Sequence, residues 1–374
     1  MMLLADLGAE VIKIEDPATG GDVSRSVAPG EIGGDSLYFQ SLNRNNRCIT
    51  LDLRSEAGKG VLRDLVRVSD GLFSNLRGDL PARLGLMYDD LATINPAIVC
   101  CSLTGFGQTG PRHAEPGYDY LIQAYSGMMS LTGEPDSPPA RAGVSVVDFS
   151  GGIAAALGLV SGILQARATG KGCDVDVSLL DTAISMLNYL AAWTLNSEYT
   201  PERLPNSSHP TLYPSQVLKT ADGYLAIMCA KEKFWQALVT EFGDSDLASD
   251  PRFTTFAGRY EHRDAFWVEL DRIFLTRTTA DWLGRLRGKV PCAPVNSVEE
   301  ALHDEQVRAR DMVIEVDHPD FGRMRQTGNP IKFPAAEQRF AAAARLGGDS
   351  DEILGSLLGY SQEQIAELTA AGAI

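Results

Sequence analysis

Basic residues are scarce in this 374-residue sequence, which has 33 Lys and Arg against 49 Asp and Glu and a formal net charge of −16. Proteins that bind nucleic acid nonspecifically, or that dock on anionic membranes, gain affinity from basic contacts to phosphate. The shortage of such residues predicts no nucleic-acid partner and no membrane partner. It carries no information about the fold.

Long apolar runs and a secretory leader are also missing. The longest apolar candidates, residues 151–164 and 183–195, are shorter than the about 18 residues that a membrane-spanning helix needs. Residues 1–5 are followed by Asp6 and contain no basic residue, so no signal peptide is predicted. The six cysteines lack C-x-x-C spacing, as expected of reduced core thiols in a cytoplasmic protein.

The five histidines are scattered, and none has the spacing of a zinc site, so no metal is predicted. No P-loop and no G-x-S-x-G motif is present. Residues 105–110 fit G-x-G-x-x-G after an apolar strand, but Pro111 follows where a dinucleotide fingerprint needs a helix. The favoured interpretation is a Gly-rich loop, and no tightly bound cofactor is predicted.

Short apolar strands alternate with helical patterns in the first half of the chain, which predicts an α/β domain. Expected strands are residues 11–14, 48–53, 71–74, 98–103 and 175–177, and expected helices are 3–7, 55–66, 118–129, 150–167 and 179–195.

Four prolines, at 201, 205, 210 and 214, mark a linker near residue 200. Asp222-Gly223 predicts a hairpin that joins strands 215–220 and 224–229. Amphipathic helices follow at 234–242, 263–275 and 279–286, and short strands are expected at 313–316 and 331–333. The middle of the chain therefore predicts a second, smaller domain.

Asp148 is a carboxylate with distinctive surroundings, because it ends an apolar stretch and precedes Ser150, Gly151 and Gly152. One interpretation is a helix N-cap, whose side chain accepts backbone N–H bonds. The other is a carboxylate nucleophile with backbone N–H groups nearby. The two are compatible, since an acid at a helix N-terminus is stabilised as its anion.

Several motifs together resemble those of the family III CoA-transferases (the CaiB/BaiF family). They span nearly the whole chain and occur in family order: residues 7–15, 43–45, 82–85, 116–119, 148–152, 169–172 and 291–295. The resemblance implies a Rossmann-like large α/β domain built from both chain ends, with a smaller α+β domain inserted, in an interlocked homodimer. On this division residues 1–200 and 311–374 form the large, CoA-binding domain, and residues 201–310 form the small domain with its linker.

The resemblance also implies an activity: CoA moves from an acyl-CoA donor to a carboxylic-acid acceptor through a covalent aspartyl intermediate. Asp148 stands at the position of the family nucleophile, and the N–H groups of Ser150, Gly151 and Gly152 are expected to support the oxyanion. CoA is polyanionic, so its site must be locally basic, and Arg77 and Arg83 are the expected phosphate partners. The full set of expected CoA contacts is Leu51, Arg54, Asn75, Leu76, Arg77, Arg83, Tyr118 and Asp119.

Three departures from the family pattern matter. Some members have a basic residue where this chain has Asp16, which weakens one phosphate contact. Residues 208–214 lack the Gly-rich loop of the formyl-CoA and oxalate members, so a formyl or oxalyl substrate is not expected. The chain starts inside the first helix of the family, so we expect it to lack a strand and a CoA-contacting loop.

Two alternatives stay open. An α-methylacyl-CoA racemase of the same fold uses an Asp and a His as acid and base, but Tyr118 stands at the His position and His113 lies five residues away. A phenol with a pKa of about 10 exchanges protons poorly at neutral pH. A catalytically idle CoA-binding protein is the other alternative, because of the short N-terminus.

Overall fold

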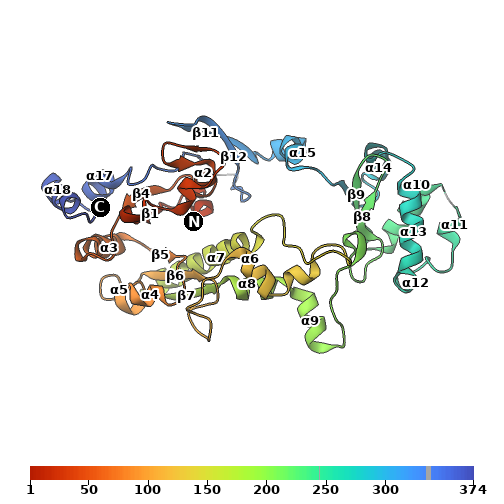
Figure 1. Ribbon diagram of the computed structural model, residues 1–374, viewed down its shortest axis with the longest axis horizontal. Coiled ribbons are helices and arrows are strands. Elements are labelled where there is room, and N and C mark those ends of the chain that lie inside the picture. Colours follow the sequence, from red (N-terminus) through yellow and green to blue (C-terminus); the bar gives the residue numbers. More distant parts are fainter. Residues whose placement is uncertain (244, 334–337) are drawn as a thin grey trace. The chain divides into compact units, whose positions relative to one another are not determined.

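The computed structural model describes residues 1–243, 245–333 and 338–374. The chain forms two compact units, and we describe each by itself (Figure 1). Unit 1 comprises Met1–Ile122, Ser145–Met186 and Leu302–Ile374, and unit 2 comprises Gln123–Val144 and Leu187–Ala301. Both chain ends thus belong to unit 1, and unit 2 includes residues 123–144, which lie outside the small domain of 201–310 expected from the sequence.

Unit 1 alternates strands and helices along the chain. Its strands are β1 (Ile12–Glu15), β2 (Glu31–Ile32), β3 (Asp35–Ser36), β4 (Arg47–Thr50), β5 (Gly71–Ser74), β6 (Val99–Thr104), β7 (Cys173–Ser178), β11 (Val313–His318) and β12 (Gly322–Thr327). Its helices are α1 (Met2–Asp6), α2 (Leu37–Asn43), α3 (Glu56–Val68), α4 (Leu80–Arg83), α5 (Tyr88–Leu91), α7 (Val146–Thr169), α8 (Leu179–Met186), α16 (Glu305–Ala309), α17 (Ser350–Glu352) and α18 (Gln362–Ala370). Two more helices, α6 (Asp119–Tyr125) and α15 (Val298–His303), contain points at which the chain passes from one unit to the other.

Parallel pairing confirms the α/β prediction. β6 lies between β5 and β7 in a three-stranded parallel sheet, and β1 pairs in parallel with β4. β6 is buried along nearly its whole length on both faces, as strands covered on both sides are. Val99 and Cys101 pack with α7, whereas Ile98 and Cys100 pack with α3. The helix expected over 55–66 is also confirmed as α3, and its N-cap is Ser55, whose Oγ accepts the N–H of Gly58 at 3.0 Å.

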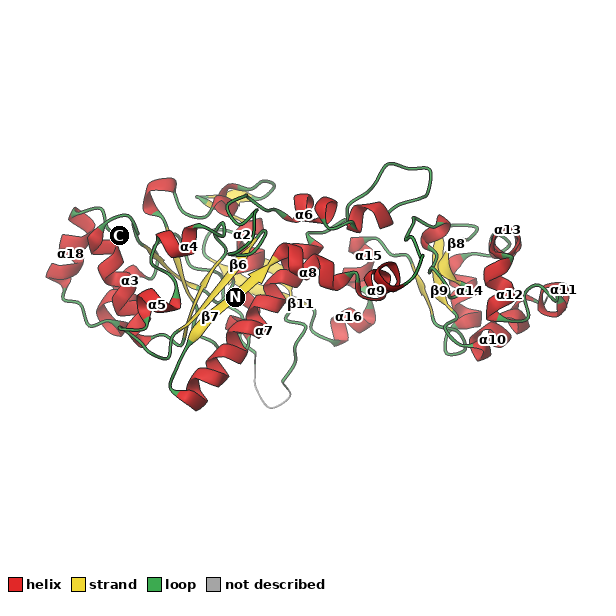
Figure 2. Ribbon diagram, turned by 90° about the horizontal axis from the view of Figure 1, so that it is seen from below, coloured by secondary structure: helices red, strands yellow, loops and turns green. Residues whose placement is uncertain are grey.

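Helix α7 lies against β6 and β7 and makes its closest approaches through small residues (Figure 2). A Cβ on Gly151 would lie 2.8 Å from Leu179, and one on Gly162 would lie 2.7 Å from Val99. Glycine at these positions therefore lets the helix sit close to the sheet. The same small residues do not interrupt the helix, which runs for 24 residues and is long and apolar enough to cross a membrane by length and composition alone. We expected no segment long and apolar enough to cross a membrane, and this was wrong because the glycines and other small residues do not interrupt α7.

A buried ion pair joins distant parts of unit 1. Arg44 Nη2 donates to Asp6 Oδ2 at 2.6 Å, and both side chains are fully buried. Asn45 and Asn329 also donate to the Asp6 carboxylate, and Arg44 Nη1 donates to the carbonyl of Thr327 at 2.6 Å. The pair and its hydrogen bonds therefore connect α1, the segment before β4 and the end of β12 with the residues that follow it.

Unit 2 has a three-stranded antiparallel sheet in the order β10 (Cys292–Pro294), β9 (Tyr224–Met228), β8 (Ser215–Lys219). Its helices are α9 (Asn188–Asn196), α10 (Glu232–Phe242), α11 (Ser245–Ser249), α12 (Phe256–Glu261), α13 (Arg263–Phe274) and α14 (Thr279–Leu286). The hairpin at Asp222-Gly223 is confirmed, with Lys219 opposite Tyr224. An aromatic core that includes Trp235, Phe266 and Trp282 holds the sheet and helices together.

Two local predictions were wrong. The helix expected over 179–195 is two helices, because the backbone at Asn188 has a φ of 44° and ends the regular pattern of α8. Residues 331–333 form no strand. Pro330 has no N–H to donate, and the N–H of Ile331 donates to the side chain of Asn329 at 2.8 Å.

Candidate active site

A cavity of about 380 Å³ lies at the carboxyl ends of β5 and β6 in unit 1. This edge of a parallel sheet is where α/β proteins bind ligands. The lining comes from the segments that follow these strands, the loop before α6, the first turn of α7 and the start of α8: Phe73, Asn75, Leu76, Arg77, Leu103, Thr104, Gly105, Pro116, Gly117, Tyr118, Asp148 and Leu179. Five of the predicted site residues are therefore brought to one cavity.

Asp148 is the third residue of α7 and lines this cavity. The residue is exposed, yet surrounding protein partly desolvates its carboxyl group. This desolvation raises the pKa of Asp148, and the nearby charge of Asp119 raises it further. The N-cap interpretation of Asp148 was wrong, because the helix begins earlier and its N-cap is Ser145. The carboxyl group is therefore presented to the cavity from the first turn of the helix.

The backbone N–H groups of Ser150, Gly151 and Gly152 do not lie at the helix N-terminus. These residues are the fifth to seventh of α7, and only the first four N–H groups at a helix start lack partners within the helix. The predicted oxyanion support by these groups is therefore corrected. Both this prediction and the N-cap prediction for Asp148 were wrong for one reason: the helix starts at Val146 and not near residue 150.

Asp119 fills the capping role that Asp148 does not. Its Oδ1 accepts the N–H of Val147 at 2.8 Å and the N–H of Asp148 at 3.3 Å. Asp119 is buried, with 6% of its surface exposed, whereas its neighbour Tyr118 is 69% exposed and lines the cavity. Of these two expected CoA contacts, Tyr118 is accessible to a ligand and Asp119 is occupied with the helix.

Arg77 and Arg83 converge on one carboxylate. Arg77 donates through Nε and Nη2 to Asp79, and Arg83 Nη1 lies 3.4 Å from the same carboxylate. Hydrogen bonding from Arg77 lowers the pKa of Asp79 to about 2. The three side chains carry a net positive charge, and Arg77 reaches the cavity of Asp148. Asp79 was missed by sequence reasoning, although its position two residues after Arg77 was a visible signal.

Leu51 and Arg54 lie outside the cavity lining. Leu51 is 1% exposed and packs in a core cluster with Ile49 and Val61, so its side chain cannot contact CoA as predicted. The cause is that Leu51 follows directly on β4 and faces into the core. Arg54 is exposed and pairs with Asp52 and Asp16.

Two glycines hold the loops around the cavity close together. A Cβ on Gly105 would lie 2.5 Å from the Cα of Gly117, so the backbones of the two loops touch. Thr104 Oγ1 accepts the N–H of Gly107 at 2.7 Å, and Asp176 accepts the N–H of Gln108 at 3.1 Å. The Gly-rich loop of 105–110 is thus fixed beside Asp148. The G-x-G-x-x-G pattern marked this loop, but the pairing of Gly105 with Gly117 left no signal in the sequence.

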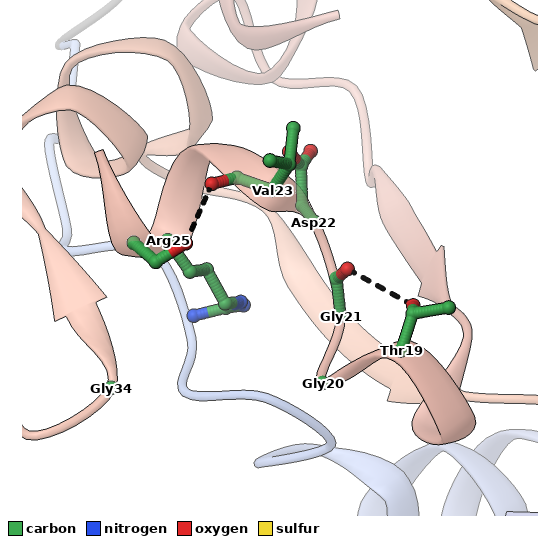
Figure 3. Close-up of a pocket in the computed structure, with 8 residues that line it drawn as sticks. Thr19, Gly20, Gly21, Asp22, Val23, Arg25 and Gly34 are labelled. Atoms are coloured by element: carbon green, nitrogen blue, oxygen red, sulfur yellow. Dashed lines mark hydrogen bonds between the residues drawn. The ribbon is translucent and has the colours of Figure 1, made fainter.

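A second cavity, of about 470 Å³, lies elsewhere in unit 1 and contains none of the predicted site residues (Figure 3). It is lined by Thr19, Gly20, Gly21, Asp22, Val23, Arg25, Ser26 and Gly34. Its buried cation, Arg25, donates through Nε and Nη2 to Glu15 at 2.9 and 2.7 Å. Its carboxylate, Asp22, pairs with Lys13 at 2.7 Å and has its pKa lowered to about 2, so the cavity of Asp148 is the better candidate for the active site. Across the described ranges, no cluster of three or more His, Cys, Asp or Glu side chains could hold a metal ion.

Comparisons with known proteins show the family of the chain. The family model described as CoA-transferase family III matches residues 1–350. The chain is 37% identical over 334 residues to the acetyl-CoA:oxalate CoA-transferase of Acetobacter aceti, covering 88% of this chain and 84% of that protein. It is 35% identical over 368 residues to the succinate–glutarate CoA-transferase of Agrobacterium fabrum, covering 95% of this chain and 90% of that protein. A crystal structure of a CaiB/BaiF family protein from Brucella suis matches with a TM-score of 0.81 at 34% identity, covering 95% of this chain and 93% of that one.

Proposed function

The chain belongs to CoA-transferase family III, and from that premise we propose that it transfers CoA between carboxylic acids through a covalent intermediate on Asp148. The observation that carries the proposal is the position of Asp148, which lines a cavity at the carboxyl edge of a parallel sheet, on the first turn of α7. Its raised pKa makes the ionised carboxylate a stronger nucleophile than an ordinary surface aspartate.

The proposed reaction has four steps. An Asp148 oxygen attacks the thioester carbonyl of the donor, so that a C–O bond forms, the C–S bond breaks and CoA leaves as its thiolate. The thiolate then attacks the Asp148 carbonyl of this mixed anhydride, which releases the donor acid as a carboxylate and leaves an aspartyl-CoA thioester. The acceptor carboxylate attacks that thioester and again releases the thiolate. Attack of the thiolate on the acceptor carbonyl gives the new acyl-CoA and restores the Asp148 carboxylate.

Hydrogen-bond donors in the cavity can support the oxyanions of these steps. Asn75, Arg77 and Tyr118 line the same cavity as Asp148 and carry N–H or O–H groups. They replace the helix N–H groups as the proposed oxyanion support. Because the mixed anhydride hydrolyses easily, exclusion of water from this cavity is part of the proposed mechanism.

We assign the CoA phosphates to the cationic surface formed by Arg77 and Arg83, with Arg54 as a more distant contact. Guanidinium groups suit bidentate contact with phosphate, and Arg77 joins this surface to the cavity of Asp148. CoA is a substrate in this proposal, and no tightly bound cofactor is proposed. The relative from Agrobacterium fabrum is named for succinate and glutarate, and residues 208–214 lack the Gly-rich loop of the oxalate members, so we propose a dicarboxylic acid longer than oxalate as donor or acceptor.

We further propose that the protein acts as a cytoplasmic, interlocked homodimer. The face of α7 turned away from the sheet is an exposed apolar stripe made of Phe149, Ile153, Leu157, Val160 and Leu164. An exposed stripe of this kind is typical of a surface that is covered in the assembly. A monomeric Leu157→Glu variant in light scattering, beside a dimeric wild type, would support a second copy as the cover. A wild-type monomer would contradict it.

Trapping tests the covalent step. The protein is incubated with succinyl-CoA and then with hydroxylamine, and the peptide that contains Asp148 is measured by mass spectrometry. We expect a hydroxamate on Asp148, and we expect Asp148→Asn to lose exchange activity while its affinity for CoA stays close to that of the wild type. An active Asp148→Asn variant would refute the assignment. Deuterium incorporation at the α-carbon of a 2-methylacyl-CoA without any acceptor acid would favour the racemase instead.

A further inference from the structure

Asp119 holds the peptide that carries Asp148. Its Oδ1 accepts two N–H groups in the first turn of α7, those of Val147 and of Asp148 itself. Both would lack a partner within the helix, because they belong to the four unpaired N–H groups at its start. Asp119 belongs to a different helix, as the first residue of α6. A buried side chain on one helix therefore fixes the start of another.

We propose that Asp119 is a positioning residue for Asp148: its carboxylate fixes the first turn of α7 and keeps a negative charge beside the carboxyl group of Asp148. The inference rests on the proposed function, in which Asp148 is the nucleophile. No role of Asp119 in binding CoA is needed, since its surface is buried.

The two effects of Asp119 act on different properties of Asp148. The hydrogen bonds fix where the carboxyl group lies, and a displacement of about 1 Å at such a site can lower the rate about 100-fold. The charge acts on ionisation, because a neighbouring anion disfavours a second anion and raises its pKa. The other ionisable side chains lining the cavity are Tyr118, before α6, and Arg77, after β5, whose guanidinium pairs with Asp79.

Two substitutions separate these effects. Asp119→Asn keeps a side-chain oxygen that can accept the N–H bonds but removes the charge. Asp119→Ala removes both. Asp174→Asn is the matched control, because Asp174 Oδ1 also accepts the first N–H of a helix, that of Tyr88 in α5, at 2.8 Å. Asp174 lies outside the cavity lining, so this control removes the same charge from a similar bond elsewhere in unit 1.

The primary measurement is the pKa of Asp148 by NMR of protein labelled with ¹³C at the aspartate carboxyl groups, with Asp148→Asn used to assign the signal. We expect Asp119→Asn to lower this pKa and Asp174→Asn to leave it unchanged. The acid limb of the pH profile of kcat should move to lower pH in Asp119→Asn for the same reason. In Asp119→Ala, kcat should fall about 10- to 100-fold, and the amides of Val147 and Asp148 should exchange faster with deuterium.

An unchanged pKa of Asp148 in Asp119→Asn would overturn the proposal, and so would an equal shift in Asp174→Asn. Failure of the proposed function gives a different result. In that case the pKa of Asp148 still falls in Asp119→Asn, but the wild type forms no adduct on Asp148 in the hydroxylamine experiment. The NMR measurement does not depend on turnover, so the two failures can be told apart.

Discussion

Replacement of Arg44 by methionine should destabilise unit 1 far more than replacement of any exposed arginine. Arg44 is fully buried and makes two hydrogen bonds to Asp6 and one to the carbonyl of Thr327. In Arg44→Met the Asp6 carboxylate stays buried with only the side-chain amides of Asn45 and Asn329 as donors. Removing one partner of a buried ion pair costs about 3–5 kcal/mol, because the other charge is left uncompensated.

Hydrogen exchange at β4 is the assay for this prediction. All four tryptophans, at 193, 235, 267 and 282, lie in unit 2, so tryptophan fluorescence does not report on unit 1. The amides of β4 lie in unit 1 and are hydrogen-bonded there: that of Arg47 donates to the carbonyl of Val11 at 2.9 Å, and that of Cys48 to Asp349 Oδ2 at 2.7 Å. When exchange occurs through opening of unit 1, a loss of 3–5 kcal/mol should speed it about 100- to 4,000-fold.

Two controls sharpen the result. Arg323→Met removes an exposed arginine that pairs with Glu315 and Asp317 in unit 1, and its effect should stay within about 1 kcal/mol. The double variant Arg44→Met/Asp6→Asn removes both charges and should be more stable than Arg44→Met alone. The reasoning is refuted if Arg44→Met accelerates exchange no more than Arg323→Met does, or if the second substitution adds to the loss.

Three further predictions concern the cation surface, the packing of α7 and the thiols. Asp79→Asn should lower the Kd for CoA by up to about fivefold in calorimetry, because Arg77 and Arg83 lose a competing anion; a higher Kd would contradict this. Gly162→Ala should destabilise unit 1 by about 1–3 kcal/mol in urea unfolding followed by circular dichroism, because its Cβ would lie 2.7 Å from Val99. Gly60→Ala in α3, with no atom within 4 Å, should instead stabilise by up to about 1 kcal/mol, and equal effects would refute the packing argument. Burial raises the pKa of Cys48, Cys100 and Cys229 to about 12 and that of Cys101 to about 11, so iodoacetamide at pH 8 should label the partly exposed Cys173 and Cys292 first; early labelling of Cys101 would be inconsistent with this.

Helices, strands and turns were predictable from the sequence where a short local pattern of residues determines them. The apolar face of α3, the strand β6 and the hairpin at Asp222-Gly223 depend on side-chain periodicity or on a two-residue turn, and all are found as expected. The start of α7 could not be predicted in this way. It depends on hydrogen bonds from Val147 and Asp148 to Asp119, which lies 28 and 29 residues earlier in the chain.

The same limit explains which of the predicted site residues line one cavity. Asn75, Arg77 and Tyr118 directly follow or precede a regular element, Asp148 lies in the first turn of α7, and these residues line one cavity at the edge where the parallel strands end. Leu51 also follows a strand, but β4 belongs to a different strand pair and its side chain faces the core. Position after a strand therefore indicates the edge of the sheet, whereas the direction of the side chain depends on which elements pack against that strand.

The excess of acidic residues, finally, does not conflict with a polyanionic substrate. A ligand responds to the charges within about 8–10 Å of it, because salt screens more distant exposed charges. The charged group that reaches the cavity lining through Arg77 is Arg77, Asp79 and Arg83, with a net charge of +1. Asp79 pairs with both guanidinium groups and therefore competes for them with an anionic ligand. Under the proposed function, the phosphates of CoA must displace this one carboxylate from the two guanidinium groups, and the local net charge of +1 favours that exchange although the whole chain is acidic.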